Sequence, residues 1–135
     1  MKGRQRNIDI LDKVVSYCNQ IDEVNQHCGN SHEALETDSV YKNAVAMCIL
    51  QIGELVGLLS DDFRETYDNV PWKDIRGMRN IAAHRYGSFD TGKLWETVTE
   101  DIPFLKQYCE EIVSSYLVLE QETVDEPTHE PDMSM

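Results

Sequence analysis

One short segment, residues 79–86, carries the side chains best suited to catalysis. It reads Arg79-Asn80-Ile81-Ala82-Ala83-His84-Arg85-Tyr86. Histidine titrates near neutral pH and can move a proton, whereas arginine stays charged and its planar guanidinium matches the oxygens of a phosphate. This combination favours chemistry at a phosphate group, and cleavage of RNA is a reaction that uses both functions.

The charge distribution makes the same region the most cationic part of the chain. The net charge of the 135 residues is −13, which argues against binding of nucleic acid by the general surface, because phosphate contacts need Lys and Arg. Between residues 73 and 85 the only acid is Asp74, and the basic residues, here called the cationic island, are Lys73, Arg76, Arg79 and Arg85. Any contact with a polyanion is therefore expected at this island.

Apolar residues recur at intervals of three and four along most of the chain, which is the pattern of amphipathic helices. It predicts helices from about residue 8 to Gly29, from Tyr41 to Leu59 behind caps at residues 37–39, from Pro71 to a stop at Gly87, over residues 91–99, and from Asp101 and Pro103 to Leu119. No alternating strand pattern occurs in the sequence. We therefore expect an all-α, antiparallel bundle of four to five helices over residues 1–119.

Two glycines stand out in the longest of these apolar stripes. Gly53 and Gly57 lie four residues apart in the helix expected over residues 41–59. A glycine inside a helix costs about 1 kcal/mol relative to alanine unless a neighbouring backbone must come close. We therefore expect another helix to pack tightly against this face.

The C-terminal residues 120–135 differ from the rest in composition. They contain no Lys or Arg, and their acids are Glu120, Glu122, Asp125, Glu126, Glu130 and Asp132. Segments with few apolar residues and a high net charge seldom order themselves. We predict a disordered acidic tail that is dispensable for folding.

The cysteines and histidines outside residues 79–86 give weak signals. Cys18, Cys48 and Cys109 fall at apolar helix positions, so reduced core thiols are expected. A metal site at His27, Cys28 and His32 is a poor alternative, since it lacks a second pair of ligands, and no metal or cofactor is expected. No apolar run is long enough to span a membrane and no secretory signal is recognisable, so a cytoplasmic protein is expected.

Helix geometry adds a constraint on Arg79 and His84. At about 100° per residue, five residues place these two side chains about 140° apart around one helix. A single regular helix cannot easily aim both into one cleft. A two-fold dimer could combine both faces, because the same patch meets itself across the axis. We therefore expect a homodimer in which the helix of residues 72–86 approaches its own copy.

The pattern R-N-x-x-x-H-x-Y at residues 79–86 resembles the HEPN superfamily, specifically the HepT-like toxins of prokaryotic toxin–antitoxin pairs. The preceding Trp72-Lys73-Asp74-Ile75-Arg76-Gly77-Met78 belongs to the resemblance, as do Leu58-Leu59-Ser60, Pro71-Trp72 and Asp101-Ile102-Pro103. The acidic tail is not part of the pattern. The resemblance implies a metal-independent endoribonuclease with its cleft between two protomers, which leaves a 2′,3′-cyclic phosphate on RNA.

The resemblance also implies roles for single residues. His84 would act as general acid or base, and Arg79 would stabilise the charge that develops on the phosphoryl oxygens. Asn80 would orient the phosphate or His84. Arg76 and Arg85 would bind flanking phosphates.

Tyr86 has two implied roles, since it could contact the substrate and is also the residue modified in such pairs. HepT-like proteins pair with small nucleotidyltransferases that attach AMP to the motif tyrosine, which would neutralise a type VII-like toxin here by modifying Tyr86. Two alternatives remain open at this point. The chain could be a non-catalytic HEPN scaffold or a nucleotide-binding partner subunit of a nucleotidyltransferase. It could also be a helical interaction domain whose arginines are only solvated charges.

Overall fold

The computed structural model describes the backbone of residues 2–83 and 91–129 and the side chains of residues 3–79 and 91–119. Its helices are α1 (Lys2–Cys28), α2 (His32–Thr37), α3 (Ser39–Val56), α4 (Asp61–Thr66), α5 (Trp72–Ala83), α6 (Thr91–Glu96), the π-helix η1 (Thr97–Asp101) and α7 (Ile102–His129). The described ranges contain no strand. The predicted all-α fold is confirmed.

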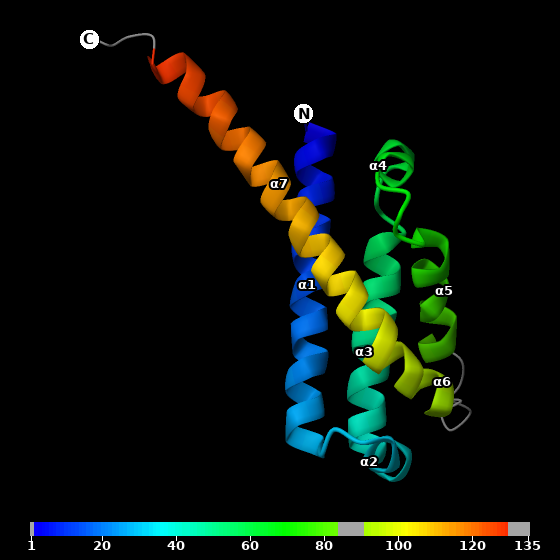
Figure 1. Cartoon of the computed structure of the whole chain (residues 1–135). Coiled ribbons are helices and arrows are strands. Elements are labelled where there is room, and N and C mark those ends of the chain that lie inside the picture. Colours follow the sequence, from blue (N-terminus) through cyan, green and yellow to red (C-terminus); the bar gives the residue numbers. More distant parts are fainter. Residues whose placement is uncertain (1, 84–90, 130–135) are drawn as a thin grey trace.

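The long helices pack as antiparallel neighbours. α3 lies against α1 on one side and against α5 on the other, while α7 crosses α1 (Figure 1). Two buried or part-buried polar pairs fix the register of α1 and α3: Tyr41 donates a hydrogen bond to Asn25 at one end, and Asn7 bonds Ser60 at the other. α5 lies at the side of the bundle and packs mainly against α3.

The core is a single cluster filled by the apolar stripes of α1, α3, α5 and α7. It includes Cys18, Cys48 and Cys109, which are buried free thiols as expected. Burial is the main reason that the pKa of Cys18 is raised to about 12, and burial also raises the pKa of the other two. Thiols that stay protonated are poor nucleophiles, so these cysteines serve packing.

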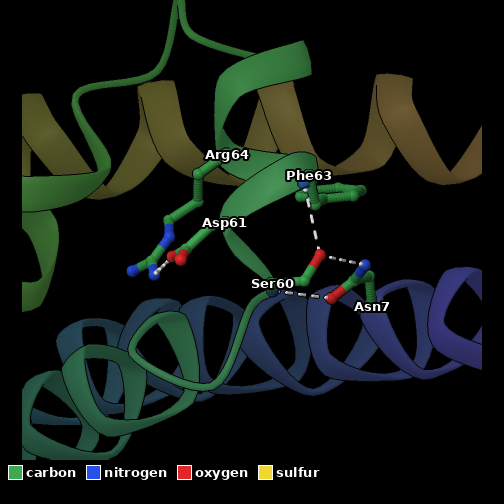
Figure 2. A network of polar contacts seen from close by, with 5 residues as sticks. All are labelled: Asn7, Ser60, Asp61, Phe63 and Arg64. Atoms are coloured by element: carbon green, nitrogen blue, oxygen red, sulfur yellow. Dashed lines mark hydrogen bonds and ion pairs between the residues drawn. The ribbon is translucent and has the colours of Figure 1, made fainter.

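A polar network joins the N-terminal part of α1 to the start of α4 (Figure 2). Asn7 donates from Nδ2 to Ser60 Oγ and accepts from Ser60 N through Oδ1, both at 3.1 Å. Ser60 Oγ in turn accepts from Phe63 N at 3.2 Å and caps α4. Beyond α4, the indole Nε1 of Trp72 donates to Tyr67 O at 2.8 Å. These bonds fix the chain that leads into α5.

Three parts of the fold differ from the sequence-based expectation. α2 and α4 are short helices in stretches for which no helix was expected. The expected cap at Asp101 is wrong, because Asp101 ends a π-helix that runs on into α7, and both flanking residues, Glu96 and Ile102, have right-handed helical backbone angles. A short polar helix has too few apolar positions to show a period, and a π turn leaves no cap signal.

The acidic segment is the third difference. Residues 120–129 are the end of α7, where a disordered tail was predicted. Glu and Gln are good helix formers, and extending an existing helix avoids the cost of starting one. Figure 1 shows this end of α7 leaving the bundle. Residues 130–135 lie outside the described residues, and the domain boundary at residue 119 stays a prediction. No described helix is long and apolar enough to cross a membrane.

Candidate active site

α5 carries the residues that the sequence placed in a catalytic site. Its inward face is made by Trp72, Ile75 and Met78, which are spaced three residues apart and are 5–6% exposed. Arg76 is exposed and Arg79 is half-buried. Pro71 directly precedes the helix, and Pro71 O accepts from Ile75 N at 3.0 Å, as expected for a helix start. The arginines therefore stand beside the apolar face and not within it.

Gly53 of α3 and Gly57, the residue that caps the C-terminal end of α3, form the surface on which these arginines lie. A Cβ atom at Gly53 would lie 2.8 Å from Arg79 Cβ and 3.1 Å from Arg79 N. A Cβ atom at Gly57 would lie 3.1 Å from Arg76 Nε. The close helix approach predicted at these glycines is confirmed at Gly53, where the backbone of α5 approaches, whereas Gly57 meets the side chain of Arg76. The absence of two side chains on α3 thus sets the position of both arginines.

Arg79 also makes an ion pair with α3. Its Nη1 lies 3.3 Å from Glu54 Oε2, and the side chains are 37% and 54% exposed. Glu54 directly follows Gly53, so neighbouring residues of α3 contact the two ends of the Arg79 side chain. Glu54 was not predicted from the sequence, because a single exposed glutamate inside a helix belongs to no motif that would distinguish it.

The cationic island is less isolated in space than in sequence. A groove of about 580 Å³ between α4 and α5 is lined by Arg76, Lys73 and Arg64, but also by acids of the two helices and of the segment that joins them: Asp61, Glu65, Asp68 and Asp74. Carboxylates weaken the attraction of a polyanion to nearby cations. Binding of RNA along this groove would therefore be weaker than the sequence of α5 alone suggests.

A second groove, of about 530 Å³, lies on another side of α5. It is lined by Gly77 and Met78 of α5, by Asp101 of η1 and by Phe104 of α7, among others. Phe104 is 48% exposed. Burial, then the carboxylate of Glu96, raises the pKa of Asp101, while Lys93 opposes the shift. This groove combines an exposed aromatic ring with a glycine on the site helix.

The described residues contain part of the predicted site. Arg76 and Arg79 are brought together on the α3 side of α5. Asn80 belongs to α5, but its side chain lies outside the described residues, and His84, Arg85 and Tyr86 lie outside them altogether. The roles predicted for those four residues, and the angular separation of Arg79 from His84, stay predictions.

The alternative metal site has no support among the described residues. These contain no group of three or more His, Cys, Asp or Glu side chains arranged to hold a metal ion. His32, one of the three imagined ligands, stacks on Trp95 with ring centroids 6.1 Å apart and an interplanar angle of 7°. Its ring is therefore used in packing α2 against α6.

Comparison with known proteins gives the family. Residues 17–112, from within α1 to within α7, match a family described as "Ribonuclease HepT-like". "Putative RNase MJ1380" of Methanocaldococcus jannaschii is 40% identical over 73 residues, which cover 54% of this chain and 67% of that protein. "Putative RNase MJ0125" of the same organism is 29% identical over 106 residues, which cover 78% and 84% of the two chains.

A third relative carries the family name itself. "Probable ribonuclease HepT" of Thermococcus cleftensis is 36% identical over 69 residues, covering 51% of this chain and 63% of that protein. No solved structure matches. All three names state a ribonuclease, so the predicted class of enzyme is confirmed at the level of the family. The chain belongs to the ribonuclease HepT-like family, within the HEPN superfamily that its R-N-x-x-x-H-x-Y motif resembles.

Proposed function

We propose that this protein is a metal-independent endoribonuclease that works as a homodimer and is the toxin of a type VII-like toxin–antitoxin pair. The observation that carries the proposal is the placement of Arg79 and Arg76 against Gly53 and Gly57 of α3. Both arginines stand at the edge of the core. Gly53 meets the backbone of each and Gly57 lies against Arg76 Nε, while the Arg79 side chain is 37% exposed and Arg76 is exposed. A preorganised cation of this kind stabilises charge on a phosphoryl group better than a freely moving surface arginine.

In the proposed reaction the 2′-hydroxyl oxygen of one nucleotide attacks its own 3′-phosphate. The new bond joins O2′ to phosphorus, the bond from phosphorus to O5′ of the next nucleotide breaks, and a 2′,3′-cyclic phosphate and a 5′-hydroxyl result. A base removes the proton from O2′ and an acid gives one to O5′. His84 takes either part, and a dimer with two copies of His84 supplies both.

The homodimer has support at Gly77 of α5. A Cβ atom at Gly77 would meet no other atom within 4 Å, so the fold of one chain does not require a glycine at this position. The glycine nevertheless costs helix stability, as noted above. A second copy of α5 that approaches the backbone at Gly77, next to the exposed ring of Phe104, explains both facts. Light scattering at micromolar concentration should give the mass of two chains, and a monomer would contradict this part of the proposal.

The acids around α5 favour a second candidate function. Glu54 and the carboxylates of α4 lower the positive potential at Arg76 and Arg79, and RNA binding depends strongly on such potential. A non-catalytic HEPN scaffold that presents a nucleotidyltransferase with its target or nucleotide would tolerate these acids. The two functions differ in whether the purified protein cuts RNA.

Substitution of the proposed catalytic residues decides between these functions. His84→Ala and Arg79→Ala should each lower the rate of RNA cleavage by about 10² or more, with an unchanged helical circular dichroism signal and dimer mass. Arg6→Ala is the matched control, because it removes an exposed arginine of α1 that lines neither groove beside α5. If His84→Ala cuts RNA as fast as the parent protein, the scaffold function replaces the ribonuclease.

Regulation by AMP is tested at Tyr86. Addition of AMP would place negative charge beside Arg79 and block RNA by repulsion and by occupation of the site. Tyr86→Phe keeps the ring but lacks the oxygen that accepts AMP. It should cleave RNA and remain active when the cognate nucleotidyltransferase and ATP are added, whereas the parent protein should lose activity and gain the mass of AMP. A Tyr86→Phe protein that is still inactivated and still gains this mass would remove Tyr86 as the acceptor.

A further inference from the structure

The pair of residues Gly53 and Glu54 of α3 acts on Arg79 at both ends of its side chain. Gly53 allows the Arg79 Cβ to approach to a distance that any side chain would block. Glu54 contacts the far end, at 3.3 Å from Nη1. Because the two residues are consecutive in one rigid helix, the direction of the arginine from backbone to guanidinium is set by α3 and not by α5 alone.

The ion pair is a poor candidate for a stabilising interaction. Both side chains are partly exposed, at 37% for Arg79 and 54% for Glu54, and exposed ion pairs add little to the stability of a fold. Glu54 also places a negative charge where a ribonuclease has to attract phosphate, which by itself weakens binding. The presence of Glu54 beside Arg79 therefore needs another explanation, and orientation of the arginine side chain is one.

We propose that Glu54 is a positioning residue for Arg79, an inference that rests on the proposed ribonuclease function. A guanidinium has five N–H donors in a fixed plane. A carboxylate that holds Nη1 fixes the rotation of this plane, so that the remaining edge meets the phosphoryl oxygens in the orientation that the transition state needs. Glu54 thereby weakens binding of RNA in the ground state and speeds the chemical step.

The signs of these two effects make the proposal testable. Glu54→Gln keeps the size of the side chain and removes the charge, and Glu54→Asp keeps the charge but withdraws it from Nη1. We expect both variants to lower kcat by roughly tenfold or more, because a misdirected catalytic group costs one to two orders of magnitude. KM for RNA should fall in Glu54→Gln, since a repulsive charge is gone, and should stay near the parent value in Glu54→Asp. Glu23→Gln, which removes an exposed carboxylate of α1, is the control and should change neither value.

Two results would overturn the inference. If Glu54→Gln lowers KM and leaves kcat unchanged, Glu54 only repels RNA. If Glu54→Gln still slows cleavage in an Arg79→Ala background, Glu54 does not act through Arg79, since residues that work through one contact are not additive.

A readout without RNA separates this inference from the proposed function. The Nη resonances of Arg79, assigned by their loss in Arg79→Lys, should show slowed rotation about the Nε–Cζ bond in the parent protein and faster rotation in Glu54→Gln. Equal rotation in both would overturn the positioning role even if the parent protein cleaves RNA. A parent protein that cuts no RNA rejects the ribonuclease and, with it, the catalytic role of Glu54, whatever the resonances show.

Discussion

The contacts of α1 with α7 and of α3 with α5 hold together the same bundle by different means. Between α1 and α7 the centre is filled by buried side chains such as Cys18 and Cys109. Near the N-terminal end of α1, Tyr116 donates a hydrogen bond to Gln5 at 2.8 Å, and Arg4 lies 5.1 Å from the centre of the Tyr116 ring. The contact of α1 with α7 is therefore made by packed side chains.

The contact of α3 with α5 depends on glycines, which have no side chain. Gly53 brings the backbones close at Arg79 and Arg76, and Gly57 leaves room for the far end of the Arg76 side chain. Large apolar side chains at this place would separate the helices and push the arginines into solvent. Glycine lets a charged residue lie at a helix–helix contact while its guanidinium stays accessible. One contact therefore serves the fold, and the other serves the fold and the site together.

The largest loss of stability is expected in the α7 part of the core. Leu105 is fully buried, and truncation of such a leucine to alanine costs about 2–5 kcal/mol because a cavity remains. Leu105→Ala should lower the midpoint of urea denaturation strongly, while the cleavage rate per folded molecule stays that of the parent protein. A variant that is stable but inactive would show that this part of the molecule also shapes the site.

Gly53→Ala should have a smaller effect on stability and a larger one on cleavage. The new Cβ atom meets the Cβ and backbone of Arg79 and the backbone of Arg76, none of which can swing away. Overpacking of this kind costs about 1–3 kcal/mol, although alanine favours a helix more than glycine does. Denaturation and cleavage should both be measured, and a variant as active as the parent protein would contradict the role of the α3–α5 spacing.

Gly77→Ala is the matched substitution on the open side of α5. With nothing within 4 Å of the new Cβ atom, alanine should stabilise the isolated chain by up to about 1 kcal/mol. The same atom would stand between two copies of α5, so the dissociation constant of the dimer should rise. Sedimentation at a series of concentrations measures it. An unchanged constant would place Gly77 outside the dimer interface.

The smallest effect is expected from Asp101→Asn in η1. The pKa of Asp101 is raised in the folded protein, mainly by burial and next by Glu96. The carboxyl group of Asp101 therefore binds its proton more tightly in the folded state than in the unfolded chain. The stability that this protonation contributes is lost as pH rises from the ordinary aspartate range through the raised pKa. Near neutral pH the variant should be slightly more stable, within about 0.5 kcal/mol, and this gain should vanish in acid. A gain that persists in acid would have another cause.

Much of the fold followed from the apolar period of the sequence. The stripes predicted α1, α3, α5 and α7, and the residue that caps α3, Asp38, lies within residues 37–39, where the sequence predicted a cap. The glycine pair correctly indicated a close helix approach. The period could not predict α2 or α4, which are too short to show one, nor the π turn of η1, which has no local signal in the sequence.

Less of the candidate site than of the fold could be predicted from the sequence. The motif identified the family through the types and spacing of residues 79–86, but motifs describe neighbours in sequence. Glu54 reaches Arg79 from another helix, and the acids of α4 reach the cationic island through the fold. Charges that meet only after folding cannot be read from a one-dimensional pattern, and here they reverse the impression of an isolated basic surface.

The proposed function requires that this chain cleaves RNA through its own side chains. The most direct test incubates the purified parent protein with RNA in the presence of a chelator and determines the chemistry of the new ends. We expect undiminished cleavage with 2′,3′-cyclic phosphate and 5′-hydroxyl ends, since in the proposed mechanism His84 would transfer the protons and Arg79 would stabilise the charge. Cleavage that stops with the chelator, or that leaves 5′-phosphate ends, would contradict the account.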